Sequence, residues 1–282
     1  MDFYKEIECF NNKYSFEEIT LSKGKFRYLI TGQGHKDTLV FLNGGTNSAD
    51  MWFKYVDDLS ADYQILLFDY SEDYKTYQEL ITGMNELFNS LNIVKPYLIG
   101  ASLGGLTAQI YSQEYTDQVS GMMLLSTAAM SKSTLSQLKI KKPFGKFLYW
   151  YLKRCNYDKL KIKMINSVVK MTKKESEDTQ KFTKDMMEYV FKDYTKEKDL
   201  HVTGLMLDLF NQTPVTSETF KSLKGKILLI LPKKDYFSSK QQSDLIEIMN
   251  NPKIVFIDGC HIATVLNVDL YLKEIRDFLQ EL

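Results

Sequence analysis

The amino-acid sequence predicts an α/β fold: a mostly parallel β-sheet with helices on both faces, interrupted by an inserted helical segment. Short apolar runs of strand length alternate with amphipathic stretches of helix length, which implies parallel strands joined by right-handed crossovers. Residues 64–69 form a near-continuous apolar run, as expected for a strand that is buried on both faces of a sheet. The alternation stops near residue 131 and resumes near residue 226, which predicts the insertion.

The predicted strands are short runs of apolar or β-branched residues bounded by turn residues. They are residues 15–21, 25–31, 38–42, 64–69, 97–99, 119–125, 226–231 and 254–257. The predicted helices of the sheet region have apolar residues at helical spacing. They are residues 49–59, 74–91, 103–115 and 265–279.

Residues 131–224 are dense in Lys, Met, Phe and Tyr and have little strand character, so we expect several helices there. The segment is too long for a connecting loop. Because the sheet pattern returns in the same style after it, we predict a core domain made of residues 1–130 and 225–282, with residues 131–224 as a helical cap.

Composition excludes several classes of protein. The 282 residues include 36 basic and 36 acidic side chains, so no global charge favours nucleic-acid binding. No stretch approaches the roughly 18 apolar residues needed to span a bilayer, and the first ten residues do not resemble a secretory signal. Three cysteines without CxxC spacing favour neither a disulfide framework nor a zinc site. We therefore expect a cytoplasmic protein without a bound metal, as a monomer or homodimer.

The segment with the clearest chemical meaning places Ser102 between Gly100 and Gly104, directly after the apolar run 97–99 and before a predicted helix. This is the layout of a nucleophile elbow, in which a sharp turn holds the serine hydroxyl clear of the backbone. Side chains at the glycine positions would collide with the closely approaching backbone. The helix N-terminus supplies positive potential beside the hydroxyl.

A serine nucleophile needs a base and an orienting acid. Of the three histidines, His35 lies in an early turn, His201 lies in the insertion, and His261 follows the last predicted strand at the carboxyl edge of the sheet. Asp235 follows the penultimate strand and is the candidate acid; the alternative is an ordinary solvated loop aspartate. Asp258 is nearer to His261 in sequence, but its Asp-Gly pair predicts a tight turn.

The chain order Ser102, Asp235, His261 resembles that of the α/β-hydrolases, in particular their cap-containing serine esterases and C–C-bond hydrolases. The resemblance covers nearly the whole chain and is weakest in residues 131–224. It implies about eight strands, a Ser-His-Asp triad and no cofactor. It predicts hydrolysis of a small to medium carboxylic ester through an acyl-enzyme; alternatives are a thioester, lactone or C–C bond, or a non-catalytic ligand-binding protein.

The oxyanion of such a reaction needs two backbone N–H donors. We expect one from Leu103 and the other from the loop after the third strand, with Gly45 as the first candidate and Gly44 or Thr46 as alternatives. The family usually carries His-Gly in that loop, whereas this chain has Asn43 before its glycines. This change alters the side-chain hydrogen bonds that hold the loop.

Two further features complete the comparison with the family. Residues 68–73 replace a Gly-rich turn that commonly contains Asp and Ser, which predicts a differently shaped loop. Trp52 resembles an aromatic residue often found near the oxyanion loop, and core packing is its expected role rather than substrate contact.

Residues 131–174 carry thirteen Lys or Arg and one acidic residue, interleaved with aromatic residues. They fit a solvated helical face whose apolar side packs on the core, or a surface that weakly contacts anionic membranes or steers acidic substrates. A cap would roof the site. Its candidate pocket residues, which an ordinary helical core would equally contain, are Phe144, Phe147, Trp150, Met164, Met187, Met206 and Phe210. The many methionine and aromatic side chains favour an apolar acyl or aryl group.

Overall fold

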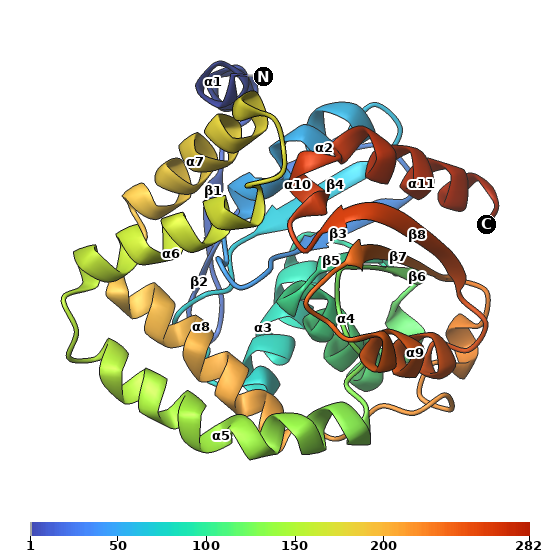
Figure 1. Cartoon of the computed structure of the whole chain (residues 1–282). Coiled ribbons are helices and arrows are strands. Elements are labelled where there is room, and N and C mark those ends of the chain that lie inside the picture. The colour runs from blue at the N-terminus through green and yellow to red at the C-terminus, as the bar shows by residue number, and fades with distance from the viewer. Residues whose placement is uncertain (1) are drawn as a thin grey trace.

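The computed structural model describes residues 2–282 and has an eight-stranded sheet at its centre (Figure 1). The strands are β1 (Glu17–Thr20), β2 (Lys25–Thr31), β3 (Thr38–Leu42), β4 (Gln64–Phe68), β5 (Tyr97–Ala101), β6 (Gly121–Leu125), β7 (Ile227–Lys234) and β8 (Lys253–Cys260). Their spatial order is β1-β2-β4-β3-β5-β6-β7-β8. β2 pairs antiparallel with β1 and β4, and every other pair is parallel, which confirms the predicted mostly parallel sheet.

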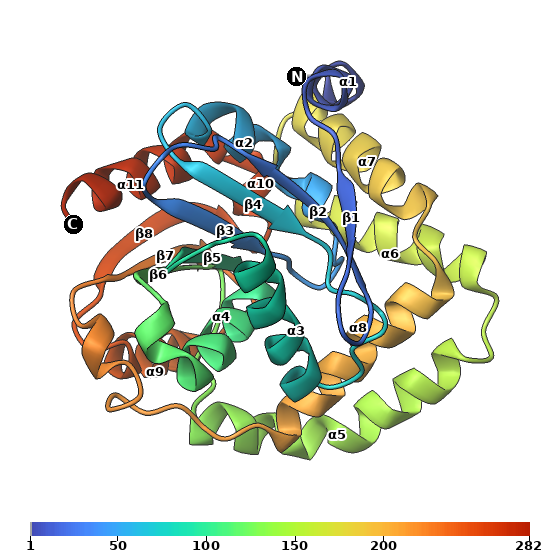
Figure 2. The same ribbon diagram turned by 180° about the vertical axis from the view of Figure 1, so that it is seen from behind.

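Helices cover both faces of the sheet (Figures 1 and 2). They are α1 (Phe3–Lys13), α2 (Phe53–Leu59), α3 (Tyr77–Ser90), α4 (Leu103–Glu114), α5 (Lys132–Leu152), α6 (Tyr157–Met171), α7 (Glu177–Lys192), α8 (Lys196–Asp208), α9 (Ser239–Ile248), α10 (Ala263–Leu266) and α11 (Val268–Gln280). α3, α4 and α9 pack on one face, and α2 and α11 pack on the other.

Strand β3 shows why the sheet is buried on both faces. All five of its residues are buried; Val40 and Leu42 belong to the apolar cluster on one face, and Leu39 and Phe41 to the cluster on the other. Side chains alternate between faces along a strand, so an uninterrupted apolar run is what a sheet with two covered faces requires.

The inserted helical segment is confirmed: α5 to α8 lie between β6 and β7 in the chain. α6 packs against α7, and α5 packs against α8 (Figure 1). The insertion also contacts the N-terminal helix, where Phe3 and Phe182 of α7 meet with ring centroids 5.6 Å apart. The division into a core domain and a cap domain 131–224 stays a prediction.

The structure corrects several local expectations. The predicted elements include neither α1 nor α9, and the predicted helix 49–59 begins as a 3-10 turn, Ala49–Trp52. The prediction of a tight turn at Asp258-Gly259 was wrong, because β8 continues through both residues to Cys260. The pairing of β7 with β8 is irregular there, and Gly259 has a φ of 143°, a conformation that favours glycine. In residues 2–282, no helix is both long enough and apolar enough to cross a bilayer.

Candidate active site

The turn at Ser102 has the geometry that its glycines predict. Ser102 lies between β5 and α4 with φ 54° and ψ −115°, a strained conformation for a residue other than glycine. A Cβ atom on Gly100 would lie 2.3 Å from the carbonyl oxygen of Gly104, and one on Gly104 would lie 2.0 Å from that of Leu42. Only glycine fits at either position, so the local sequence fixes the turn. The turn holds the serine hydroxyl clear of the backbone.

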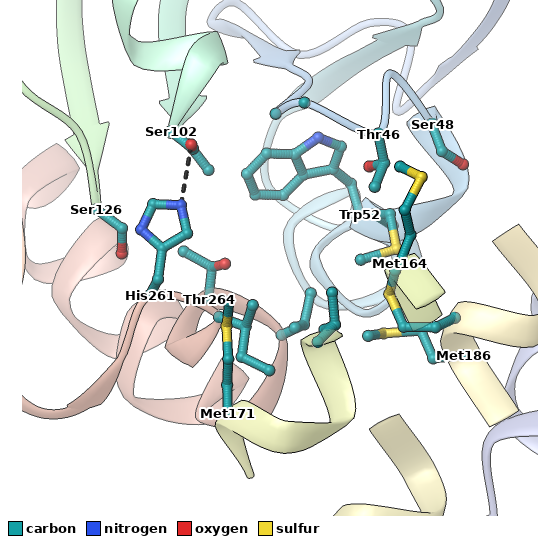
Figure 3. A pocket seen from close by; sticks show the side chains of 18 of the residues that line it. Thr46, Ser48, Trp52, Ser102, Ser126, Met164, Met171, Met186, His261 and Thr264 are labelled. Atoms are coloured by element: carbon teal, nitrogen blue, oxygen red, sulfur yellow. Dashed lines mark hydrogen bonds between the residues drawn. The ribbon is translucent and has the colours of Figure 1, made fainter. Parts of the chain in front are cut away.

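Ser102, His261 and Asp235 form a continuous chain of hydrogen bonds. The Ser102 hydroxyl oxygen lies 2.9 Å from Nε2 of His261, and Nδ1 of the same ring lies 2.8 Å from Oδ1 of Asp235 (Figure 3 draws the first contact). The Asp235 side chain is 1% exposed, and Oδ1 also accepts a bond from the backbone N–H of Phe237. Asp235 follows the end of β7, and His261 follows that of β8, so the sheet brings together the three residues singled out in the sequence.

The other two histidines lie elsewhere. His35 is exposed in the turn after β2. His201 is buried in α8, where Nε2 lies 2.7 Å from the carbonyl oxygen of Tyr74. Burial lowers the pKa of His201, and the nearby lysines Lys75 and Lys198 lower it further. His201 is therefore a structural residue of the insertion.

Sequence reasoning missed Tyr236. Its ring lies against the His261 imidazole, with centroids 3.8 Å apart, and its hydroxyl oxygen lies 2.5 Å from Nε2 of His261 and 3.5 Å from the Ser102 hydroxyl oxygen. The pKa of Tyr236 is raised, chiefly by burial of the hydroxyl and further by the charge of Asp235. The residue as a whole is 62% exposed, so this burial is local to the hydroxyl end. The signal that could have identified Tyr236 is its position directly after Asp235, because the loop that places Asp235 beside His261 also places the next residue near the site.

The expected oxyanion donors lie beside Ser102. A Cβ atom on Gly44 would lie 3.5 Å from the carbonyl oxygen of Ala101 and 3.7 Å from Cβ of Ser102, so the loop after β3 runs alongside the elbow. Within residues 2–282, the backbone N–H groups of Gly44, Gly45 and Leu103 donate to no protein acceptor. They are therefore free to bind an anion, and the choice of Gly45 over Gly44 stays a prediction.

Asn43 holds this loop through its carboxamide. Its Nδ2 donates to the carbonyl oxygen of Phe68 at 2.8 Å and to Oδ1 of Asn47, while its Oδ1 accepts from the Trp52 indole N–H at 3.1 Å. Asn47 in turn bonds both the N–H and the carbonyl oxygen of Tyr70. The two departures from the family pattern are therefore linked, because the asparagines after β3 bind the loop after β4.

Ser102, His261 and Tyr236 line a cavity of about 310 Å³. Six methionines line it: Met51, Met164, Met171, Met186, Met187 and Met206. Figure 3 shows Ser102 and His261 on one side, with Met164 and Met186 across the pocket. Among the described lining residues, none is a lysine, arginine, aspartate or glutamate. The cavity is therefore apolar apart from the hydroxyl groups and the imidazole.

Of the candidate pocket residues in the insertion, the methionines line the cavity and the aromatic residues do not. Met164, Met187 and Met206 line the cavity, whereas Phe144, Phe147 and Trp150 of α5 are exposed at the surface. Phe210 lies under Lys142, whose ammonium is 5.4 Å from the ring centroid. Trp52 packs against Phe41 and Tyr55 in the core, as predicted, and also lines the cavity.

Comparisons with known proteins agree with the fold. The sequence profile of a family described as "alpha/beta hydrolase fold" matches residues 37–267. The chain is 29% identical over 122 residues to a putative 2-succinyl-6-hydroxy-2,4-cyclohexadiene-1-carboxylate synthase of Bacillus subtilis, covering 39% of this chain and 43% of the relative. It is 28% identical over 114 residues to an uncharacterized carboxylesterase, nap, of the same organism, covering 37% and 38%. These matches thus span about two fifths of each relative.

The fold is shared with solved structures. The enol-lactonase from Burkholderia xenovorans superposes with a TM-score of 0.73 at 18% identity, covering 94% of this chain and 100% of that one. At this identity the likeness concerns the fold alone.

Proposed function

Because this chain belongs to the α/β-hydrolase fold family, we propose that it is a serine hydrolase acting on uncharged carboxylic esters with a medium-length apolar acyl group. One observation carries the proposal: Ser102, His261 and Asp235 form an unbroken hydrogen-bond chain at the wall of an apolar cavity.

The first half of the reaction forms an acyl-enzyme. Nε2 of His261 takes the proton of the Ser102 hydroxyl as its oxygen attacks the ester carbonyl carbon. The Leu103 N–H and one glycine N–H, with Gly45 as the candidate, stabilise the negative charge that develops on the carbonyl oxygen. The imidazolium then returns the proton to the leaving alkoxide, and the alcohol departs.

The second half releases the acid. His261 takes a proton from water, the resulting hydroxide attacks the acyl carbon, and the ester bond to Ser102 breaks as the proton returns to the serine oxygen. Asp235 holds the Nδ1 proton of His261 and stabilises the imidazolium in both halves. Its burial, with only 1% of the side chain exposed, keeps this partner in a fixed orientation.

The cavity supports the substrate class. At about 30 Å³ for each water-sized group, 310 Å³ holds roughly ten non-hydrogen atoms. Methionine side chains are flexible and polarisable, so they adapt to an apolar chain. A substrate carboxylate would find no cationic side chain among the described lining residues, and burying it unpaired is costly. This disfavours a carboxylate-bearing ligand such as the product named for the Bacillus synthase.

Two measurements test the proposal. A fluorophosphonate probe should label the wild-type protein and not Ser102→Ala; Ser112→Ala, on the same helix α4 but outside the cavity, should label normally. p-Nitrophenyl esters of increasing acyl length should give the highest kcat/KM near eight to ten carbons, above matched thioesters, lactones and C–C substrates. Absence of labelling in folded protein would instead support a non-catalytic binding protein.

A further inference from the structure

Helix α5 carries an exposed stripe of apolar side chains. Ile140, Phe144, Phe147 and Tyr151 recur at spacings of four and three residues, so they lie on one face of the helix. Phe144 is 69% and Phe147 57% exposed, and the Phe147 ring stacks on that of Trp150 with centroids 5.7 Å apart. Soluble proteins rarely expose contiguous large apolar patches without a function.

The stripe faces away from the protein. The opposite side of α5 makes the tertiary contacts: Leu135 and Leu152 are buried, and a Cβ atom on Gly145 would lie 2.8 Å from Leu207 of α8. Figures 1 and 2 both place α5 at the rim of the molecule, with α8 on its inner side. Phe144, Phe147 and Tyr151 therefore face solvent. The solvated-helix alternative expected such aromatic side chains to pack on the core.

A row of lysines runs beside the stripe. Lys132, Lys139, Lys146 and Lys153 recur every seven residues, close to two helical turns, and all four are exposed. No acidic residue occurs in α5. Among the described side chains of residues 131–174, no lysine or arginine forms an ion pair with a carboxylate of the chain. Carboxylates of the chain therefore do not neutralise the described basic side chains of this segment.

We infer that the exposed face of α5 is a docking surface for an anionic lipid bilayer. Phenylalanine, tryptophan and aliphatic side chains enter the interfacial region, while the flanking lysines meet the negative headgroups. A bilayer fits better than a folded protein because the apolar stripe and the row of lysines run side by side over residues 140–151 of α5. A bilayer offers both an apolar interior and a broad field of negative charge.

The position of the surface links it to the cavity. α5 packs on α8, and α8 contributes Met206, which lines the cavity and is partly exposed. Docking through α5 would hold the insertion at the bilayer surface, where an ester with an apolar acyl chain partitions. The docking itself does not rest on the proposed hydrolase activity, so failure of one leaves the other standing.

Vesicle binding of the full chain tests the inference. The protein should co-sediment with vesicles of phosphatidylcholine and phosphatidylglycerol and much less with phosphatidylcholine alone, and salt should weaken the binding. Trp150 is half exposed and the other tryptophan, Trp52, is buried, so binding should shift the emission of Trp150 to shorter wavelength. Brominated lipids should quench this emission, and Trp150→Phe should abolish the change.

Matched variants identify the surface. Phe144→Ser with Phe147→Ser should weaken binding at least ten-fold, and Lys146→Ala should weaken it about five-fold, from roughly 1 kcal/mol per basic residue near a charged membrane. Phe256→Ser on β8 and Lys240→Ala on α9, both exposed, serve as controls and should bind like the wild type. Circular dichroism should show that the double phenylalanine variant, Lys146→Ala and the two control variants all have the Tm of the wild type.

Three results would overturn the inference: no binding to anionic vesicles, equal binding to neutral and anionic vesicles, or equal binding by the α5 variants and the wild type. Sedimentation velocity tests a second copy of this chain as the occupant. Concentration-dependent dimerisation that Phe147→Ser abolishes, together with absent vesicle binding, would assign the face to self-association instead.

Discussion

The hydroxyl oxygen of Tyr236 lies 2.5 Å from Nε2 of His261, the same nitrogen that lies 2.9 Å from the Ser102 hydroxyl oxygen. A neutral imidazole whose Nδ1 proton is directed to Asp235 has one acceptor lone pair at Nε2. The hydroxyl groups of Ser102 and Tyr236 therefore compete for one acceptor. Only the hydrogen bond from Ser102 leads to the proton transfer that activates the nucleophile.

The competition predicts the effect of removing the tyrosine hydroxyl. Tyr236→Phe keeps the ring against His261 and should raise the rate of Ser102 labelling by a fluorophosphonate two- to five-fold. Tyr236→Ala also removes the ring and should lower the rate, because His261 loses the packing that orients it. If Tyr236→Phe instead lowers kcat ten-fold at unchanged KM, the hydroxyl takes part in the reaction, for example as a donor to the leaving oxygen.

Asp235→Asn tests the orienting acid. The amide cannot stabilise an imidazolium and favours the wrong imidazole tautomer, so kcat should fall by about 10³- to 10⁴-fold with little change in KM. Asp258→Asn is the matched control. Its side chain is 88% exposed and pairs with Lys233 at 3.1 Å, so kcat should be unchanged. A comparable loss in both variants would contradict the assignment of Asp235.

Gly104→Ala tests the steric basis of the elbow. The new Cβ would lie 2.0 Å from the Leu42 carbonyl oxygen, so the backbone must move, and the free energy of unfolding should fall by at least about 2 kcal/mol. At Gly204, in the interior of α8, the nearest atom to a new Cβ is 3.9 Å away. Gly204→Ala should therefore stabilise the protein, by up to about 1 kcal/mol. Urea unfolding monitored by circular dichroism measures both.

Asn43→Ala tests the network that joins the two loops. It leaves the buried Trp52 N–H and Phe68 carbonyl without their partner, so unfolding should become easier by about 2–3 kcal/mol. The labelling rate of Ser102 should fall as well, because the loop carries the candidate oxyanion donors. In a double-mutant cycle with Asn47→Ala the two losses should be less than additive, since both residues bind the loop after β4. Full additivity would mean that the asparagines act independently.

His201 predicts a dependence of stability on pH. Burial, followed by the charges of Lys75 and Lys198, lowers its pKa in the folded state, although the Tyr74 carbonyl and Asp73 oppose the shift. Below about pH 6.5 the unfolded chain therefore binds more protons than the folded one at this site. The free energy of unfolding should fall as pH falls below 6.5, by up to about 1.4 kcal/mol per pH unit.

Substitution of His201, with His35 as the control, isolates the contribution of His201 to the pH dependence of the unfolding free energy. His201→Gln should flatten the slope of unfolding free energy between pH 5 and 7, whereas the exposed His35→Gln should leave it unchanged. Chemical unfolding at each pH measures both slopes. An unaltered slope in His201→Gln would show that other groups cause the dependence.

Several elements could be predicted because their signals are local. Strands β2 and β3 have the predicted bounds. β2 alternates polar and apolar residues at its start and ends before Gly32, and β3 is an apolar run that ends before Asn43. Helix α9 was missed because its only buried residue is Leu245, which leaves little apolar periodicity. The Asp258-Gly259 pair was misread because a sheet can absorb a glycine at positive φ as a bulge, and local sequence does not distinguish that from a turn.

The sequence by itself determined the order along the chain of the eight strands and of helices α2, α3, α4 and α11. It also determined the elbow, which accommodates only glycine at positions 100 and 104, and the three residues that meet at the carboxyl edge of the sheet. These follow from periodicity and from steric limits that act within a few residues. Only the tertiary structure decided that the Tyr236 hydroxyl and the Ser102 hydroxyl both contact Nε2 of His261, and that Asn43 and Asn47 join two loops. It also decided that Phe144, Phe147 and Trp150 of α5 face outward. Such relations depend on the packing of segments far apart in the chain, and a helix of aromatic and basic residues has the same periodicity whichever face it turns to its neighbours.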